Sequence, residues 1–332
     1  MNRLYRGDNL EVLRRHIASE SIDLVYLDPP FNSKRSYYVI FHRDSDGEDG
    51  DAPVPAFDDT WRWTRSVSEQ YHRCVTGELP AQVAAALTAL HTLLGENDAM
   101  AYLVNMAPRL VELHRVLRET GSVYLHCDPV MSHYLKVLLD AIFGFDKFRN
   151  EIVWHHQLGA MTAKSRFPSK HDVILWYSKG GNPKFHKLRG EITPQMLRKY
   201  SHEDENGRYM VSYGRKYYLK GGKPLDDVWD IPAIAPTSKE RLGYPTQKPL
   251  ALLKRIIAAG SDEGDVVLDP FCGCGTAIDA AIQLNRRWIG IDITPIAIDL
   301  VKRRLADAHG EAINDTYQVL DVPRLVMCPT SG

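Results

Sequence analysis

Two short apolar runs in this 332-residue chain each end in an aspartate that is followed at once by proline. The first run, residues 21–27 (SIDLVYL), leads into Asp28 and two prolines, and the second, residues 265–268 (DVVL), leads into Asp269 and one proline. Short runs rich in β-branched residues are typical of strands buried on both faces of a parallel sheet. Proline ends each strand because it lacks an N–H group. The chain is therefore expected to form a sheet whose strand ends carry acidic loops.

Strand-like and helical patterns alternate through most of the chain. The further expected strands are residues 122–126, 151–154, 172–177 and 287–291, and the expected helices are residues 81–94, 99–117, 130–143, 247–259, 276–284 and 295–309. Gly121 is the expected stop of the second helix. This alternation predicts an α/β fold with a doubly wound parallel sheet.

Two segments interrupt the alternation. Residues from 32 to about 65 are polar and rich in Asp and Gly, which predicts a mobile loop. Residues 180–235 are rich in Gly, Lys and Tyr and contain only short irregular pieces, which predicts a separate small module.

Basic residues are concentrated in the middle of the chain. Residues 155–225 contain 14 Lys and Arg against 5 Asp and Glu, a net charge of about +9, whereas the remainder is about −10. Such a block favours a surface that binds a polyanion, although a solvated face would have the same composition. The candidate contact residues are Lys164, Arg166, Lys170, Arg215, Lys216 and Lys220.

Composition excludes several other classes of protein. No run approaches the roughly 18 apolar residues of a membrane span, and the first residues lack the apolar core of a signal peptide, so a cytoplasmic protein is expected. The five cysteines are scattered except for one C-x-C, which does not match the spacing of a zinc site. No metal is expected.

The segment after the second apolar run, DPFCGCGT, has the composition of a ligand-binding turn. Gly273 and Gly275 lie between a strand and a helix start, where the backbone can approach a ligand closely and helix N–H groups are free. A further strand-like run ends at Asp292, 17 positions after Gly275, where a carboxylate can bind both hydroxyls of a ribose. The pair predicts a nucleoside-bearing cofactor.

A dinucleotide dehydrogenase would use similar elements, but its fingerprint requires G-x-G-x-x-G near the start of the domain. Here Gly275 is followed by TAIDAAI, which has no third glycine. The pattern therefore favours a cofactor without a pyrophosphate, such as S-adenosylmethionine.

The tetrapeptide Asp28-Pro29-Pro30-Phe31 follows the first apolar run. Its two prolines fix the loop and leave carbonyl oxygens that point in set directions. An amino group that attacks a methyl sulfonium must lose its conjugation with the ring, and two acceptors that hold its hydrogens achieve this. Asp28 and the Pro29 carbonyl can serve as these acceptors, and Phe31 offers a face on which a base can stack.

Together, DPPF and DPFCGCGT resemble motifs IV and I of the amino-methylating DNA methyltransferases. Their order is similar to that of the beta group, in which the catalytic loop comes first, the recognition region lies in the middle and the cofactor motif comes last. The resemblance covers nearly the whole chain. It implies a Rossmann-like fold with permuted motif order, S-adenosylmethionine as cofactor, and a target base flipped out of double-stranded DNA.

The resemblance also implies roles for individual residues. Residues 4–13 (LYRGDNLEVL) look like the segment ahead of the catalytic strand, which would place Asp8 at the cofactor's adenine. Residues 244–253 (YPTQKPLALL) look like motif X, which would place Thr246, Gln247 and Lys248 at its methionine end. The other implied cofactor residues are Asp269, Pro270, Phe271, Gly273, Gly275, Thr276 and, at the ribose, Asp292, while Asp28, Pro29, Pro30 and Phe31 would receive the target base.

The expected division of the chain follows from the same resemblance. Residues 1–154 would form a catalytic half, residues 155–240 a basic target-recognition insert, and residues 241–332 a cofactor-binding half that completes the same domain. The insert is expected to hold the DNA backbone, and the loop after Phe31 is expected to close over the flipped base.

The target base is expected to be adenine, methylated at N6. In the family an Asp or Asn ahead of the two prolines is more often associated with adenine and a Ser with cytosine-N4, so Asp28 favours adenine. Phe31 stands where Tyr is commoner, and keeps the stacking face without the hydroxyl.

Other hypotheses remain open in the sequence. A non-catalytic DNA-binding regulatory relative would share the fold, but the intact Asp28 and Asp269 argue against it. An enzyme that methylates RNA or protein is a further alternative, and the basic insert argues against a protein-glutamine substrate. A homodimer and a cognate restriction endonuclease also stay open as partners. His126, Cys127 and Asp128 are interpreted as a strand-end loop that lines the cofactor cleft, rather than as a metal site or a proton relay.

Overall fold

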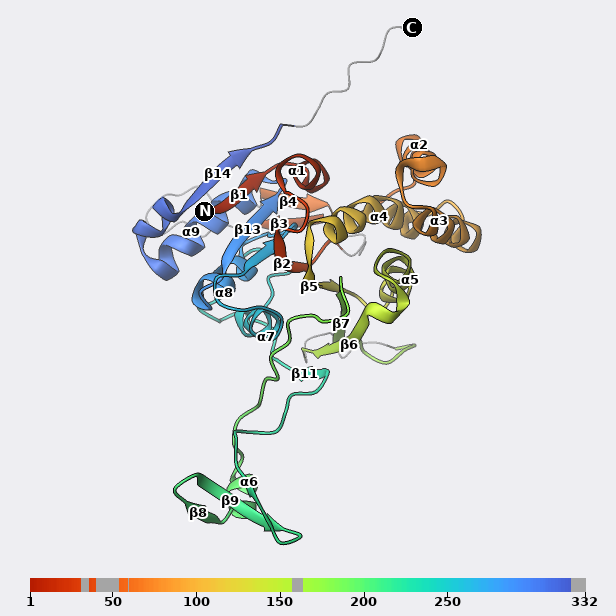
Figure 1. Cartoon of the computed structure of the whole chain (residues 1–332). Coiled ribbons are helices and arrows are strands. Elements are labelled where there is room, and N and C mark those ends of the chain that lie inside the picture. The colour runs from red at the N-terminus through yellow and green to blue at the C-terminus, as the bar shows by residue number, and fades with distance from the viewer. Residues whose placement is uncertain (31–35, 40–53, 59, 157–163, 324–332) are drawn as a thin grey trace, which may run out of the picture.

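The computed structural model describes residues 1–30, 36–39, 54–58, 60–156 and 164–323 (Figure 1). Within these residues nine strands form one sheet, in the order β11-β6-β7-β5-β2-β12-β13-β1-β14. The strands are β1 (Asn2–Arg6), β2 (Ile22–Leu27), β5 (Leu117–Cys127), β6 (Phe148–His155), β7 (His171–Ser178), β11 (Val228–Asp230), β12 (Val266–Asp269), β13 (Arg287–Asp292) and β14 (Tyr317–Asp321). The predicted α/β class is confirmed.

The expectation of a fully parallel sheet is wrong at one strand. Every neighbouring pair is parallel except those of β7, which is antiparallel to both β5 and β6. His155 at the end of β6 is paired with His171 at the start of β7, so the chain returns directly beside the strand that it has just left. A parallel neighbour would need a crossover connection, usually a helix. The sheet is therefore mixed.

The two ends of the chain share the centre of this sheet. Leu24 and Val25 of β2 are paired with Val267 and Leu268 of β12, and β1 lies between β13 and β14. Because these strands are parallel, their carboxyl ends lie on one edge. The loops after β1, β2, β12 and β13 consequently open at the same place.

Helices cover both faces of the sheet. One face packs against α1 (Asn9–His16), α2 (Arg65–Arg73), α3 (Ala81–Leu94), α4 (Asp98–Val116) and α5 (Ser132–Phe143). The opposite face packs against α7 (Leu250–Gly260), α8 (Thr276–Gln283) and α9 (Pro295–His309). In β2 the alternation is direct, since Val25 and Leu27 belong to the first core cluster and Leu24 and Tyr26 to the second.

Two expected element boundaries are wrong. Helix α4 ends at Val116, and Gly121 lies inside β5, where an added Cβ would come within 3.0 Å of the Asp23 carbonyl oxygen. This glycine allows a close approach of two strands instead of stopping a helix. Helix α7 begins at Leu250 rather than at residue 247, because Pro249 caps it and Thr246 has a left-handed backbone with φ of 61°.

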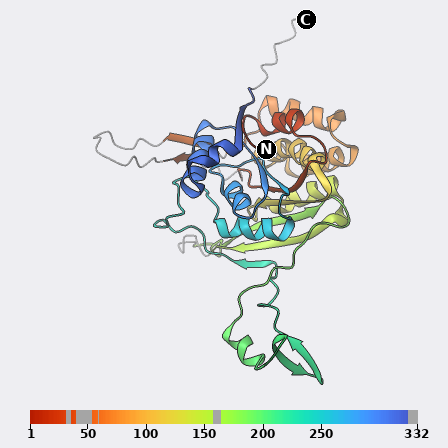
Figure 2. The ribbon, with the colours of Figure 1, turned by 60° about the vertical axis from the view of Figure 1, so that its left-hand side comes forward.

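A small module projects from the body of the molecule at the end of two extended segments (Figures 1 and 2). It consists of α6 (Pro194–Lys199) and a three-stranded sheet of β8 (His202–Asp204), β9 (Gly207–Ser212) and β10 (Arg215–Tyr218). Strands β7 and β11 flank it in the sequence and belong to the main sheet. The module and the two extended segments that carry it, residues 179–227, therefore lie outside the main sheet, between β7 and β11.

The segment expected to be a mobile loop lies largely outside the described residues. Its described parts include β3 (Ser36–Val39) and β4 (Val54–Asp58), which pair as an antiparallel hairpin. A search of the described residues for a helix long and apolar enough to cross a membrane finds none.

Candidate active site

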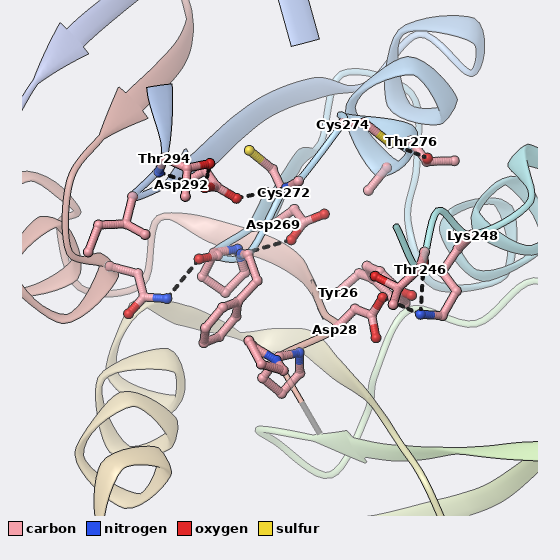
Figure 3. Close-up of a pocket in the computed structure, with 18 of the residues that line it drawn as sticks. Tyr26, Asp28, Thr246, Lys248, Asp269, Cys272, Cys274, Thr276, Asp292 and Thr294 are labelled. Carbon is pink, nitrogen blue, oxygen red and sulfur yellow. Dashed lines mark hydrogen bonds and ion pairs between the residues drawn. The ribbon is translucent and has the colours of Figure 1, made fainter. Parts of the chain in front are cut away.

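A cavity of about 520 Å³ lies at the carboxyl edge of the central strands (Figure 3). It is lined by residues from both ends of the chain, which meet there because β2 and β12 are neighbours. The predicted site residues that line it are Asp8, Asp28, Pro29, Pro30, Thr246, Gln247, Lys248, Asp269, Pro270, Phe271, Gly273, Thr276 and Asp292. Phe31 lies outside the described residues.

The glycine turn after β12 closes one wall of the cavity. Gly273 has φ of 48°, and a Cβ at this position would lie 3.0 Å from the ring of Tyr244. Gly275, with φ of 79°, caps α8 but does not line the cavity. A Cβ there would lie 3.0 Å from Val301, so Gly275 allows close packing between α8 and α9.

The carboxylate of Asp292 accepts hydrogen bonds from the glycine turn and from Thr294. One oxygen, Oδ2, accepts a hydrogen bond of 3.0 Å from Gly273 N. The other, Oδ1, accepts from Thr294 N and from Thr294 Oγ1, each at 2.9 Å. Burial raises the pKa of Asp292, although these hydrogen bonds act in the opposite direction. The carboxylate thus joins the glycine turn to the end of β13.

Asp269 lies deeper, at 4% exposure. Its Oδ1 accepts from Phe271 N at 3.0 Å. Burial raises the pKa of Asp269 well above its usual range, and the charges of Asp28 and Asp292 raise it further. With Asp8, four carboxylates therefore line one cavity, which suits a ligand that carries positive charge and several hydrogen-bond donors.

Arg109 of α4 is a part of the site that the sequence did not suggest. Its guanidinium donates to both oxygens of Asp8 at 3.2 Å and to Asn9 Oδ1 at 2.6 Å. Asn9 Nδ2 in turn donates to the Pro270 carbonyl at 2.8 Å, while Asp8 also accepts from Leu10 N at the start of α1. Arg109 and Asn9 thus tie the end of β1 to α4 and to the glycine turn. No sequence pattern relates Arg109 to Asp8, 101 positions away.

Asp28 contacts the segment that precedes α7. The ammonium of Lys248 lies 2.6 Å from Asp28 Oδ2 and also donates to the Thr246 carbonyl at 3.3 Å. Gln247 lines the cavity but uses its amide within its own turn, since it accepts from Leu242 N and donates to the Glu240 carbonyl. The structure thus brings together the two prolines after β2, the segment of residues 244–253 and the glycine turn.

The interpretation of His126, Cys127 and Asp128 as the lining of the cleft is wrong, since none of the three lines the cavity. His126 is fully buried, and its ring nitrogens lie 3.0 Å from the Tyr26 hydroxyl and 3.2 Å from Asp172 Oδ2. Asp128 instead accepts from Val130 N and Met131 N ahead of α5. Among the described residues no group of three or more His, Cys, Asp or Glu side chains could hold a metal ion.

The predicted DNA-contact residues lie away from the cavity, and none of them lines it. Lys164 and Arg166 are exposed, as are Arg215 and Lys220, while Lys170 is half-buried. Lys216 is exposed but forms an ion pair of 2.6 Å with Asp204 within the small module. These positions are compatible with a surface, and they do not form a pocket.

Comparison with known proteins places the chain in a family. A family profile of N6/N4 enzymes described as DNA methylase matches residues 22–303. The Type II methyltransferase M.EcaI of Enterobacter cloacae is 29% identical over 91% of this chain and 69% of its own length. The DNA adenine methyltransferase YhdJ of Escherichia coli is 27% identical over 95% of this chain and 86% of its own length.

Solved structures share the fold at lower identity. A Thermus thermophilus protein assigned as a DNA modification methylase, complexed with S-adenosyl-L-methionine, has a TM-score of 0.52 at 20% identity, covering 97% of this chain and 100% of its own. The cytosine-N4-specific PvuII DNA methyltransferase has a TM-score of 0.53 at 17% identity, covering 98% and 96%.

The chain belongs to the family of N6/N4 amino DNA methyltransferases. It is an S-adenosylmethionine-dependent DNA methyltransferase that acts on an exocyclic amino group.

Proposed function

We propose that the chain methylates adenine at N6 in double-stranded DNA, with Asp28 and the Pro29 carbonyl as the two acceptors for the amino group. The observation that carries this proposal is the placement of Asp28 and Pro29 in the same cavity as Asp269, Gly273 and Asp292. That placement lets one cavity hold a methyl donor and a target amino group side by side.

The cavity fits S-adenosylmethionine by its shape and its chemistry. Gly273 leaves space that a Cβ would fill, and the surrounding carboxylates suit the ribose hydroxyls and the positive charges of such a ligand. We assign Asp292 to the ribose, Asp8 to the adenine and Thr246 to the methionine end. Lys248, which the resemblance places at the same end, pairs with Asp28 instead. The complex of the Thermus thermophilus protein with S-adenosyl-L-methionine supports the choice of cofactor.

The loop of Asp28 and Pro29 would act by orienting the target amino group toward the methyl donor. When bound, S-adenosylmethionine supplies a methyl group on a positively charged sulfur. Asp28 Oδ and the Pro29 carbonyl oxygen each accept one hydrogen of the target amino group, which takes the nitrogen lone pair out of conjugation and aims it at the methyl carbon. Transfer of the methyl group breaks its bond to sulfur and would leave S-adenosylhomocysteine, and Asp28 is also placed to take the proton that the nitrogen loses as the new N–C bond forms.

The target base has to leave the duplex before it can reach this loop. Flipping costs a few kcal/mol of stacking and pairing, which contacts to the DNA backbone must offset. We propose that the basic segment of residues 155–225 supplies these contacts, with the small module of residues 194–218 at its end. The proposed contact residues are Lys164, Arg166, Lys170, Arg215, Lys216 and Lys220.

The order of the parts along the chain supports the beta-group arrangement. The Asp28 loop follows β2 near the start of the chain, the module comes next, and the glycine turn follows β12 near the end. We propose on this basis that residues 1–154 and 241–332 form one catalytic domain around a DNA-recognition insert. Strands β7 and β11 of the intervening residues also belong to the sheet of that domain.

The identity of the methylated base decides between adenine-N6 and cytosine-N4. Unmethylated plasmid DNA incubated with the protein and S-adenosylmethionine is digested to nucleosides and analysed by mass spectrometry. We expect N6-methyldeoxyadenosine. N4-methyldeoxycytidine in its place would overturn the adenine assignment while preserving the two-acceptor loop.

A further inference from the structure

The ion pair between Lys248 and Asp28 joins motif X to the catalytic loop. The two charged groups are 2.6 Å apart, and their side chains are only 9% and 16% exposed (Figure 3). We propose that Lys248 is a positioning residue for methyl transfer, which holds the Asp28 carboxylate oxygen that the target amino group will take over. This inference rests on the proposed role of Asp28.

The turn that carries Lys248 is strained in a way that serves this contact. Thr246 is a β-branched residue with φ of 61°, a backbone conformation that such residues rarely adopt. Gln247 holds the strained turn, because its side chain bonds to the Glu240 carbonyl at 2.7 Å and to Leu242 N at 2.9 Å. The Thr246 carbonyl then accepts from the Lys248 ammonium. Strain at this place directs the ammonium into the cavity.

The groups around the ion pair are mostly acidic. Burial raises the pKa of Asp269 well above its usual range, with the Asp28 charge adding to the rise and Lys248 acting against it. Burial also raises the pKa of Tyr26 and of Tyr244, and the Asp28 charge contributes to both. Removing the ammonium would leave Asp28 facing these groups without its cation.

Strands β5 and β7 contribute the remaining titratable neighbours. Burial acts to raise the pKa of Asp172. The hydrogen bond to His126 and electrostatic interactions with His126 and Lys248 act in the opposite direction, and the net effect is a lowered pKa. Burial raises the pKa of Cys127, with a contribution from Asp28. Lys248 therefore interacts electrostatically with three carboxylates, those of Asp28, Asp172 and Asp269, and its ammonium pairs directly with Asp28.

This geometry allows the target amino group to replace Lys248 as the hydrogen-bond donor to Asp28. Ammonium and amino groups both present N–H donors, so a flipped base can replace the Lys248 bond to Asp28 with its own. A base without an amino group would displace a charged hydrogen bond and form none in its place. Lys248 would thus make entry into the catalytic loop depend on the group that is to be methylated.

The test removes the charge while keeping the length of the side chain. Lys248→Met is compared with Lys248→Arg, which retains the charge, and with Lys239→Met, which removes an exposed ammonium from the same segment outside the cavity. Two quantities are measured for each variant: the dissociation constant of S-adenosylmethionine, and the rate of labelled-methyl transfer to unmethylated plasmid DNA from about pH 5 to 9.

We expect Lys248→Met to lower the transfer rate at neutral pH by about tenfold or more and to move the acid side of the pH profile to higher pH. Its affinity for S-adenosylmethionine should change by less than about threefold. Lys248→Arg should restore the shape of the pH profile, and Lys239→Met should match the wild type. If Lys248→Met does not fold, Lys248→Gln takes its place in the comparison.

The opposite pattern would overturn the inference. An S-adenosylmethionine affinity weakened by about tenfold with an unshifted pH profile would assign Lys248 to the cofactor alone. Failure of the proposed function is distinguishable, because the wild type would then transfer no methyl group to an amino group, or Asp28→Ala would remain active. Wild-type transfer that is lost in Asp28→Ala but is unaffected by Lys248→Met would refute only the role of Lys248.

Discussion

Replacing Asp292 by asparagine should weaken cofactor binding without weakening the fold. Asp292 accepts three hydrogen bonds from protein groups, at Gly273 N, Thr294 N and Thr294 Oγ1. In the proposed complex it also accepts from the ribose. Asparagine keeps the shape of the side chain, removes the charge and turns one acceptor oxygen into a donor.

The size of the effect follows from that exchange of acceptor for donor. Whichever way the amide is turned, its NH₂ group faces an N–H group or a ribose hydroxyl that previously had an acceptor. The loss of one charged hydrogen bond costs about 1.5–3 kcal/mol, so the dissociation constant for S-adenosylmethionine should rise by about 10- to 150-fold. Because burial raises the pKa of Asp292, the neutral side chain avoids burying a charge. We therefore expect the Tm without cofactor to change by less than about 3 °C.

Isothermal titration calorimetry and thermal denaturation measure the two quantities. Asp299→Asn is the matched control, because Asp299 is 73% exposed on α9 and pairs only at 3.7 Å with Lys302. An Asp292→Asn variant that binds S-adenosylmethionine like the wild type would refute the ribose assignment. A large fall in Tm would show instead that Asp292 acts mainly in the fold.

Three further predictions concern other parts of the molecule. Arg109→Leu removes the guanidinium from Asp8, so it should lower the free energy of unfolding by about 1–3 kcal/mol in urea titrations, and an unchanged midpoint would contradict this. Arg215→Ala should reduce the slope of log affinity for duplex DNA against log salt by about 0.9, and an unaltered slope would remove Arg215 from the interface. Asp269 has a raised pKa in the folded state, so its charge destabilises the fold at pH 7 and this cost disappears as the pH falls toward the ordinary value of 3.8. Asp269→Asn should accordingly gain more stability over the wild type at neutral pH than at mildly acidic pH in denaturant titrations, and the reverse order would refute the sign.

The acidic residues at the strand ends were the part of the site that could be predicted from the sequence. Asp28, Asp269 and Asp292 each follow a short apolar run, and runs of that kind form parallel strands whose carboxyl ends share one edge. Local pattern was therefore sufficient to bring three distant residues together. The glycines between Asp269 and α8 could be predicted for the same reason, because a tight strand-to-helix turn needs backbone conformations that glycine adopts easily.

Contacts between distant side chains could not be read in this way. Arg109 reaches Asp8 from a helix 101 positions along the chain, and Lys248 reaches Asp28 across 220 positions. These pairs depend on how α4 and the segment before α7 pack against the sheet, which no local pattern encodes. The antiparallel direction of β7 was missed because a strand buried on both faces has the same apolar composition in either direction.

The role of Asp28 is tested most directly by the transfer of a labelled methyl group. Wild type and Asp28→Ala are each incubated with isotope-labelled S-adenosylmethionine and unmethylated plasmid DNA, and calorimetry establishes that both bind the cofactor. We predict label on an exocyclic amino group for the wild type and a loss of at least about 100-fold for Asp28→Ala at similar cofactor affinity. Transfer that persists in Asp28→Ala would contradict the two-acceptor mechanism.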